Sequence, residues 1–172
     1  MNSKGFVLKA TTLKVMSINR LRVAGSIAVD VPADKALAIL HNIERIERYE
    51  PKVDSIQVKP LTAATGTYSA QGHFAGMPWR GAFSYHLNDW GFQSEMVRGA
   101  MGIRVKAGFS VKSESVRKCS ITHYEDYRLP YWASMLTLLL RPYLFQAMRR
   151  EMSNLAEVIQ TDAGLEPQPE AA

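Results

Sequence analysis

The sequence predicts one α+β domain, in which a curved antiparallel sheet of about seven strands wraps around a long C-terminal α-helix, with two short helices after the first strand. Segment 53–129 is rich in β-branched and aromatic residues and is interrupted by turn residues, which is typical of a strand meander. After Pro130 the apolar residues take up helical spacing. A chain of 172 residues has the usual length of one domain, so the sheet and the helix should share one core.

The first half of the predicted domain starts with a strand over residues 20–30, where apolar residues alternate with others. Pro32 then opens a helix that has one apolar side. A second short helix must stop before Pro51, because the residue before a proline avoids the helical conformation. The turn signals in segment 53–129 leave about six further strands in a meander.

The last predicted element is a long amphipathic helix, whose apolar stripe follows spacings of three and four residues. The stripe consists of Leu144, Met148, Met152, Leu155 and Ile159. Pro142 cannot continue a helix already in progress, so residues 131–140 are expected to form a separate short helix or a bent first segment. A sheet of this width must coil, and this helix is large enough to fill its concave face and leave a ligand cavity at the open end.

The charge of the chain is unevenly placed. The net charge is +5, and residues 1–29 contain five basic residues and no acidic ones. We therefore divide the chain into a basic, flexible N-terminal arm over residues 1–20, a single domain over residues 21–161 and a loose tail over residues 162–172. The arm could contact an anionic membrane or RNA, but a solvated leader is the simpler interpretation.

The single cysteine and the lengths of the apolar runs indicate the cellular compartment of the protein. Cys119 is the only cysteine, which excludes an internal disulfide and predicts a small core residue in a reducing compartment. The apolar run at residues 6–8 is too short for a signal peptide. The longest apolar stretch, residues 131–140, has about half the length that crosses a bilayer. We therefore expect a cytoplasmic protein.

Two segments carry a resemblance to a known superfamily. Residues 26–58 read SIAVDVPADKALAILHNIERIERYEPKVDSIQV, and residues 141–159 read RPYLFQAMRREMSNLAEVI. Over about residues 21–161 the chain resembles the START, or SRPBCC, helix-grip superfamily, in its polyketide cyclase/dehydrase-like or coenzyme Q-binding-like branch. Val31-Pro32 and Tyr49-Glu50-Pro51 stand at the family's helix start and aromatic-x-Pro positions, whereas Leu37 and Tyr49 stand where tryptophan is common.

The resemblance implies a helix-grip fold with a hydrophobic cavity. Members of the superfamily include lipid-transfer proteins, coenzyme Q-binding proteins, plant hormone receptors and aromatase/cyclases. The fold alone therefore does not determine the function.

Strand alternation predicts which side chains face the cavity, because the apolar set of each strand marks its core side. The predicted ligand-binding residues are Trp79, Phe83, Tyr85, Phe92, Met96, Arg98, Val105, Phe109 and Ile121 from the strands, with Leu144, Met148 and Met152 from the long helix.

Polar residues on the inward side suggest chemistry. His123, Glu125 and Tyr127 share one face of a predicted strand, and Arg98 is the expected ion-pair partner of Glu125. A histidine paired with a carboxylate can act as a general base, and Tyr85 or Tyr127 could stabilise a developing oxyanion, as an aldol-type cyclisation requires. The alternative is that these residues lie at a solvated cavity mouth, because a β-bulge would reverse the facing of a strand.

Metal and cofactor sites are not expected. The histidine and acidic residues lack a recurring ligand spacing, and the glycines at 99, 102 and 108 form neither a dinucleotide fingerprint nor a P-loop. We therefore predict no metal, no cofactor and no nucleotide or nucleic-acid partner.

Three functions are compatible with the sequence. The first is binding or transport of a hydrophobic small molecule such as a lipid, an isoprenoid or a polyketide-like compound, which needs no catalyst. The second is a cofactor-free cyclase, aromatase or dehydratase that uses His123, Glu125 and Tyr127. The third is an interaction module that docks on a membrane, RNA or protein through the basic arm or an apolar segment. That segment contains Trp132, Met135, Leu136, Leu139, Tyr143 and Phe145.

Overall fold

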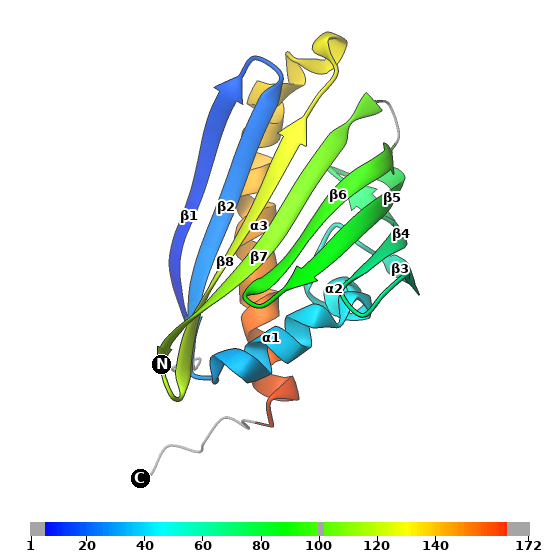
Figure 1. Ribbon diagram of the computed structural model, residues 1–172. Coiled ribbons are helices and arrows are strands. Elements are labelled where there is room, and N and C mark those ends of the chain that lie inside the picture. The colour runs from blue at the N-terminus through cyan, green and yellow to red at the C-terminus, as the bar shows by residue number, and fades with distance from the viewer. Residues whose placement is uncertain (1–5, 100–101, 165–172) are drawn as a thin grey trace.

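The computed structural model describes residues 6–99 and 102–164, and it shows one curved sheet with a long helix along one face (Figure 1). The sheet has eight strands, all antiparallel to their neighbours, in the order β1-β2-β8-β7-β6-β5-β4-β3. The strands are β1 (Phe6–Ser17), β2 (Arg20–Val29), β3 (Ser55–Pro60), β4 (Thr65–Phe74), β5 (Met77–Asn88), β6 (Gly91–Gly99), β7 (Arg104–Ser115) and β8 (Lys118–Arg128).

The helices follow the predicted order. The helices are α1 (Ala33–His41), the 3₁₀ turn η1 (Ile43–Arg45), α2 (Ile46–Tyr49), the 3₁₀ turn η3 (Tyr131–Ala133) and α3 (Leu136–Asp162). The predicted α+β class, the antiparallel sheet and the long C-terminal helix are confirmed. The predicted strand count was wrong, because the sheet has eight strands instead of seven.

The additional strand is β1, which occupies residues 6–17 of the predicted basic arm. It pairs with β2 and packs against α3 through the half-buried Phe6, Leu8 and Leu13. A register irregularity between Leu8 and Ala10 interrupts the alternation of apolar residues, so the sequence of the strand resembles a lysine-rich leader. Residues 1–5 of the arm and 165–172 of the predicted tail lie outside the described residues.

The long helix is continuous across Pro142 instead of being two separate helices. Proline has no N–H to bond to the carbonyl of Leu138, one turn earlier. Leu138 is 63% exposed, so water can reach this part of the helix. None of the helices in the described ranges is long and apolar enough to cross a membrane.

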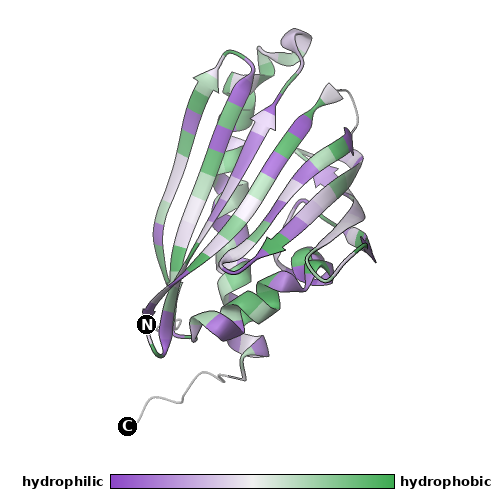
Figure 2. Ribbon diagram, in the orientation of Figure 1, coloured by the Kyte–Doolittle hydropathy of each residue, from purple (hydrophilic) through white to green (hydrophobic). Residues whose placement is uncertain are grey.

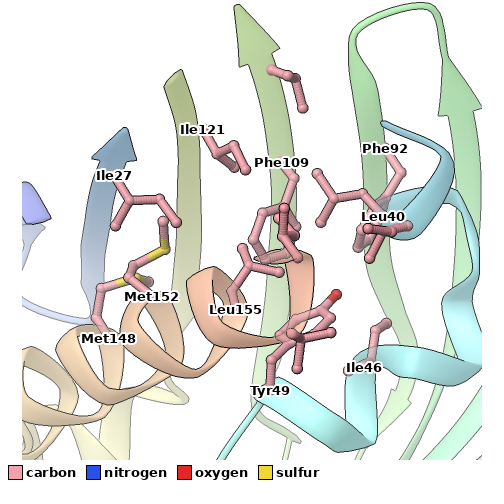
Figure 3. Close-up of a cluster of buried hydrophobic side chains, with 14 of the residues drawn as sticks. Ile27, Leu40, Ile46, Tyr49, Phe92, Phe109, Ile121, Met148, Met152 and Leu155 are labelled. Atoms are coloured by element: carbon pink, nitrogen blue, oxygen red, sulfur yellow. The ribbon is translucent and has the colours of Figure 1, made fainter. Parts of the chain in front are cut away.

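The core lies between the sheet and α3, and Figure 3 shows its members on both sides. Ile27, Phe109 and Ile121 extend from strands toward Met148, Met152 and Leu155 of α3, and Phe92 lies beside Leu40 of α1. Apolar and polar residues alternate along the strands, as the bands in Figure 2 show. Cys119 is a buried core residue with a free thiol. Its burial raises the pKa of the thiol to about 11.

Candidate functional site

A cavity of about 380 Å³ lies beside this core, between strands β4 to β8, α2 and the start of α3. Six of the predicted ligand-binding residues line it. They are Trp79, Phe83, Phe92, Met96, Val105 and Phe109. Exposed residues such as Arg80, Trp132 and Leu136 also line the cavity and mark its mouth.

Five other predicted ligand-binding residues do not line the cavity. Ile121, Leu144, Met148 and Met152 are buried in the closed core between β2, β8 and α3, and Tyr85 is buried against Tyr68. The predicted stripe of α3 is therefore mainly packing. The cavity instead meets α3 at its first turns and at Glu151.

Arg98 is exposed on the outer face of the sheet, so its predicted inward position was wrong. Ala82 pairs with Arg98 and Phe83 pairs with Met96, which leaves Val97 as an extra residue in β6. Because of this β-bulge, the side chains after Val97 point to the face of the sheet opposite to the one that strict alternation predicts. The predicted ion pair between Arg98 and Glu125 does not form.

Six buried polar residues meet at the inner side of the cavity, and we call them the charged cluster. They are Glu50, Lys52, His123, Glu125, Tyr127 and Glu151, each at most 8% exposed. Glu50 and Lys52 come from the loop after α2, the next three from β8, and Glu151 from α3. The structure therefore brings the three predicted catalytic residues together with three residues that were not predicted.

Lys52 is the cation of the charged cluster. Its Nζ donates hydrogen bonds to both carboxylate oxygens of Glu125, at 2.9 Å each, and lies 3.2 Å from Oε1 of Glu50. The hydroxyl of Tyr127 donates to Oε2 of Glu125 at 2.9 Å. Glu125 is thus fully paired, with both oxygens held by donors.

His123 is held as a neutral imidazole. Its Nδ1 lies 3.0 Å from the carbonyl oxygen of Gly108, which can only accept, so Nδ1 carries the proton. Burial lowers the pKa of His123 below its usual value. Its Nε2 therefore presents a lone pair, 3.0 Å from Oε1 of Glu151 but not aligned for a hydrogen bond.

The three carboxyl groups of the charged cluster have different pKa values. Burial raises the pKa of Glu50 well above its usual value, and the charge of Glu151 raises it further. Burial likewise raises the pKa of Glu151 to about 7, against the opposing charge of Lys52. Burial opposes ionisation of Glu125 too, but Lys52 lowers its pKa below the usual range. Glu125 is therefore ionised near neutral pH, Glu151 titrates there, and Glu50 is held toward its protonated form.

Trp79 and Gly72 both contact the backbone carbonyl of Lys52. The indole Nε1 of Trp79 donates to the carbonyl oxygen of Lys52 at 2.8 Å. Gly72 lies against the same carbonyl, and a Cβ at position 72 would come within 2.0 Å of that oxygen. A residue without a side chain is therefore required for this close approach.

The three cluster residues that were not predicted differ in how clearly the sequence pattern marks them. Glu151 lies three residues after Met148 and four before Leu155, so it interrupts the apolar stripe of α3 with a charge. That position was a usable signal. Glu50 and Lys52 flank Pro51 in a loop, where charged residues are ordinary, and nothing in the local pattern marks them as buried.

Four members of the charged cluster could hold a metal ion. One ligand atom from each of Glu50, His123, Glu125 and Glu151 lies within 4.8 Å of the others. Sequence spacing could not reveal this set, because the residues come from a loop, a strand and a helix. The ammonium of Lys52 already lies among these carboxylates, within 3.5 Å of each of the three.

Many solved structures share this arrangement of a curved antiparallel sheet against one long helix. This is the helix-grip fold of the START/SRPBCC superfamily. The Zhui aromatase/cyclase from Streptomyces sp. R1128 is 10% identical, with a TM-score of 0.66 over 84% of this chain and 94% of that chain. A START superfamily protein from Mycobacterium smegmatis is 12% identical, with a TM-score of 0.65 over 81% and 97% of the two chains.

Human StAR-related lipid transfer protein 5 also has the helix-grip fold. It is 7% identical, with a TM-score of 0.67 over 89% of this chain and 88% of that chain. No protein-family model matches the sequence, and no curated protein matches it. At these identities the likeness establishes the fold alone, and function depends on the residues of the site.

Proposed function

We propose that the protein binds and carries a hydrophobic small molecule in the cavity between the sheet and α3. The observation that carries the proposal is an apolar cavity of about 380 Å³, walled by residues such as Phe83, Phe92 and Phe109, that ends at the charged cluster. Burying about 300 Å² of apolar ligand surface would contribute roughly 7 kcal/mol before the costs of association. Solved structures of the same fold that are named lipid transfer protein and aromatase/cyclase support this choice.

A pair of valine substitutions tests whether this cavity holds the ligand. Val105 lines the cavity, whereas Val97 on the adjacent strand is 53% exposed on the outer face of the sheet. We expect Val105→Trp to fill the cavity and weaken binding of the neutral fluorescent probe 1-N-phenylnaphthylamine at least tenfold. Val97→Trp should leave the affinity unchanged, and thermal unfolding should show both variants folded.

Equal probe affinity for the wild type and Val105→Trp would place the bound probe elsewhere and reject the proposal. Native mass spectrometry of the purified protein, followed by denaturing extraction, would name the natural ligand. A copurifying hydrophobic compound is the expected result. Delipidated protein that binds no hydrophobic probe at all would also reject the proposal.

Acid–base catalysis on the bound molecule, as a cyclase, aromatase or dehydratase, is a second candidate. It is favoured by Glu151, whose pKa of about 7 lies near the working pH and whose carboxyl lies beside Nε2 of His123. If the extracted ligand is a substrate, His123→Ala should lower its turnover at least a hundredfold while binding persists. A ligand that wild-type protein leaves chemically unchanged would reject this candidate.

We also propose peripheral membrane contact through segment 131–139. Trp132, Met135 and Leu139 are 70%, 76% and 72% exposed, and Trp132 lies at the cavity mouth. Exposed aromatic and aliphatic side chains of this kind insert at the membrane interface. The segment would therefore place the mouth where a hydrophobic ligand enters.

Sedimentation with phosphatidylcholine/phosphatidylserine vesicles tests the membrane contact. We expect the double substitution Trp132→Ser and Leu139→Ser to lower the bound fraction at least fivefold. The control is Trp90→Ser, which removes a tryptophan that is 56% exposed in the turn between β5 and β6. Binding that disappears in 0.5 M salt would instead indicate the basic residues near the N-terminus.

A further inference from the structure

Two buried acceptors of the charged cluster have no hydrogen-bond partner. Nε2 of His123 and Oε2 of Glu151 have no hydrogen-bond partner, although their residues are 2% and 1% exposed. Lys52 and Tyr127 donate to Glu125, and Nδ1 of His123 donates to Gly108. The ammonium of Lys52 lies 3.5 Å from Oε2 of Glu151, as an ion-pair contact without a hydrogen bond. A ligand that reaches these atoms must therefore bring hydrogen-bond donors.

Tyr49 adds a hydroxyl to the same side of the cavity. Its Oη has no partner, its residue is 1% exposed, and burial together with the charges of Glu151 and Glu50 raises its pKa. Figure 3 shows this hydroxyl extending from α2 into the interior. A hydroxyl oxygen can accept a hydrogen bond from a ligand donor.

The charges of the cluster point to a cation. Glu50, Glu125 and Glu151 are three buried acidic groups around one ammonium, that of Lys52, and His123 is neutral. A further positive charge would be favoured here, because it compensates the carboxylates in a region of low dielectric. A ligand carboxylate would instead add a fourth acidic group to this buried region.

The candidate ligand atoms of the charged cluster lie close together. The candidate ligand atoms of Glu50, His123, Glu125 and Glu151 lie within 4.8 Å of one another. Lys52 already shows that an alkylammonium is accepted, with both of its contacts to Glu125 at 2.9 Å.

We propose that the charged cluster is a recognition site for a protonated amine, so that the molecule carried in the cavity is a hydrophobic amine and not a fatty acid. The inference rests on the proposed ligand-binding function and specifies the class of its ligand. The ammonium of the ligand donates to Oε2 of Glu151 and Nε2 of His123, and its apolar part lies against the aromatic wall.

A matched series of twelve-carbon ligands tests the inference. Dodecylamine, dodecanol and laurate are each used at pH 8 to displace 1-N-phenylnaphthylamine from the cavity. We expect dodecylamine to bind at least tenfold more tightly than dodecanol, and laurate at least tenfold more weakly, because hydrogen bonds to charged groups exceed those between neutral groups. Val105→Trp should weaken the binding of all three.

Substitution of a cluster carboxylate separates head-group recognition from general affinity. Glu151→Gln should reduce the preference for dodecylamine over dodecanol about tenfold. Glu95→Gln is the control, because Glu95 is an exposed glutamate that pairs with Lys106 on the outer face of the sheet. The preference should be unchanged in this variant.

Three results would overturn the inference. Dodecanol that binds as tightly as dodecylamine would leave the ligand-binding function standing and remove the amine specificity. A preference that survives Glu151→Gln would place the amine elsewhere. Submicromolar binding of Zn²⁺ that displaces dodecylamine, and is lost in His123→Ala, would identify the charged cluster as a metal site instead. Failure of the probe itself to bind would instead reject the proposed function.

Discussion

Lys52→Met is expected to lower the free energy of unfolding by about 3 to 5 kcal/mol at pH 8. The substitution keeps the length of the side chain but removes the ammonium that donates to both oxygens of Glu125. Glu50, Glu125 and Glu151 would remain buried without a cation among them. The loss should be smaller at pH 5, where the carboxyl groups can take up protons. Urea unfolding at both pH values measures the difference.

The matched control is Lys106→Met. Lys106 also pairs with a glutamate, Glu95, but both side chains are more than half exposed, so the cost should stay under about 1 kcal/mol. Combining Lys52→Met with Glu125→Gln should restore part of the lost stability, because it removes the carboxylate that was left unpaired. Wild-type stability of Lys52→Met at pH 8 would show that the ammonium does not compensate these carboxylates.

Glu151→Gln is expected to become more stable relative to wild type by roughly 3 kcal/mol as the pH rises from 5 to 8. The pKa of Glu151 is about 7 in the folded protein, against 4.5 as the ordinary value. The folded state therefore binds the proton more tightly than the unfolded state. Stability from this group is present at low pH and is lost as the pH rises through about 7, and a difference of about 2.5 in pKa corresponds to roughly 3 kcal/mol.

The difference between variant and wild type is the quantity to measure, because other titrating groups face Glu151. Glu50 has a raised pKa and acts in the same direction, whereas His123 has a lowered pKa and makes stability rise with pH as it loses its proton. Lys52 and Glu125 stay charged across this range. A flat difference curve, like the one expected for Glu95→Gln, would mean that Glu151 titrates normally in the folded protein.

Most of the fold could be predicted because the apolar period of each segment is clear. Six strands between residues 53 and 129 and the amphipathic residues of α3 follow directly from periods of two and about three and a half residues. The strand β1 was missed, because its irregularity near Leu8 and its lysines make the segment resemble a solvated arm. A local interruption of the period was enough to hide a strand that the tertiary structure supports.

The candidate site was predicted only where one strand carries it. Alternation along β8 identified His123, Glu125 and Tyr127 together, because the three share one face. The bulge at Val97 reversed the facing of Arg98, and such an insertion leaves no mark in a single sequence. Glu50 and Lys52 reach the charged cluster from a loop, so the packing of Gly72 and Trp79 determines their position.

The sheet ends in two open edges, β1 and β3, and both carry residues that discourage pairing with another chain. β1 contributes Lys14, and β3 contributes Lys59 and Pro60. An unpaired strand edge is a template for strands of neighbouring molecules, and lysine or proline at the edge opposes their addition through charge repulsion or a missing N–H donor. The basic residues of β1, which make its sequence resemble a flexible leader, thus oppose edge-to-edge aggregation of the curved sheet.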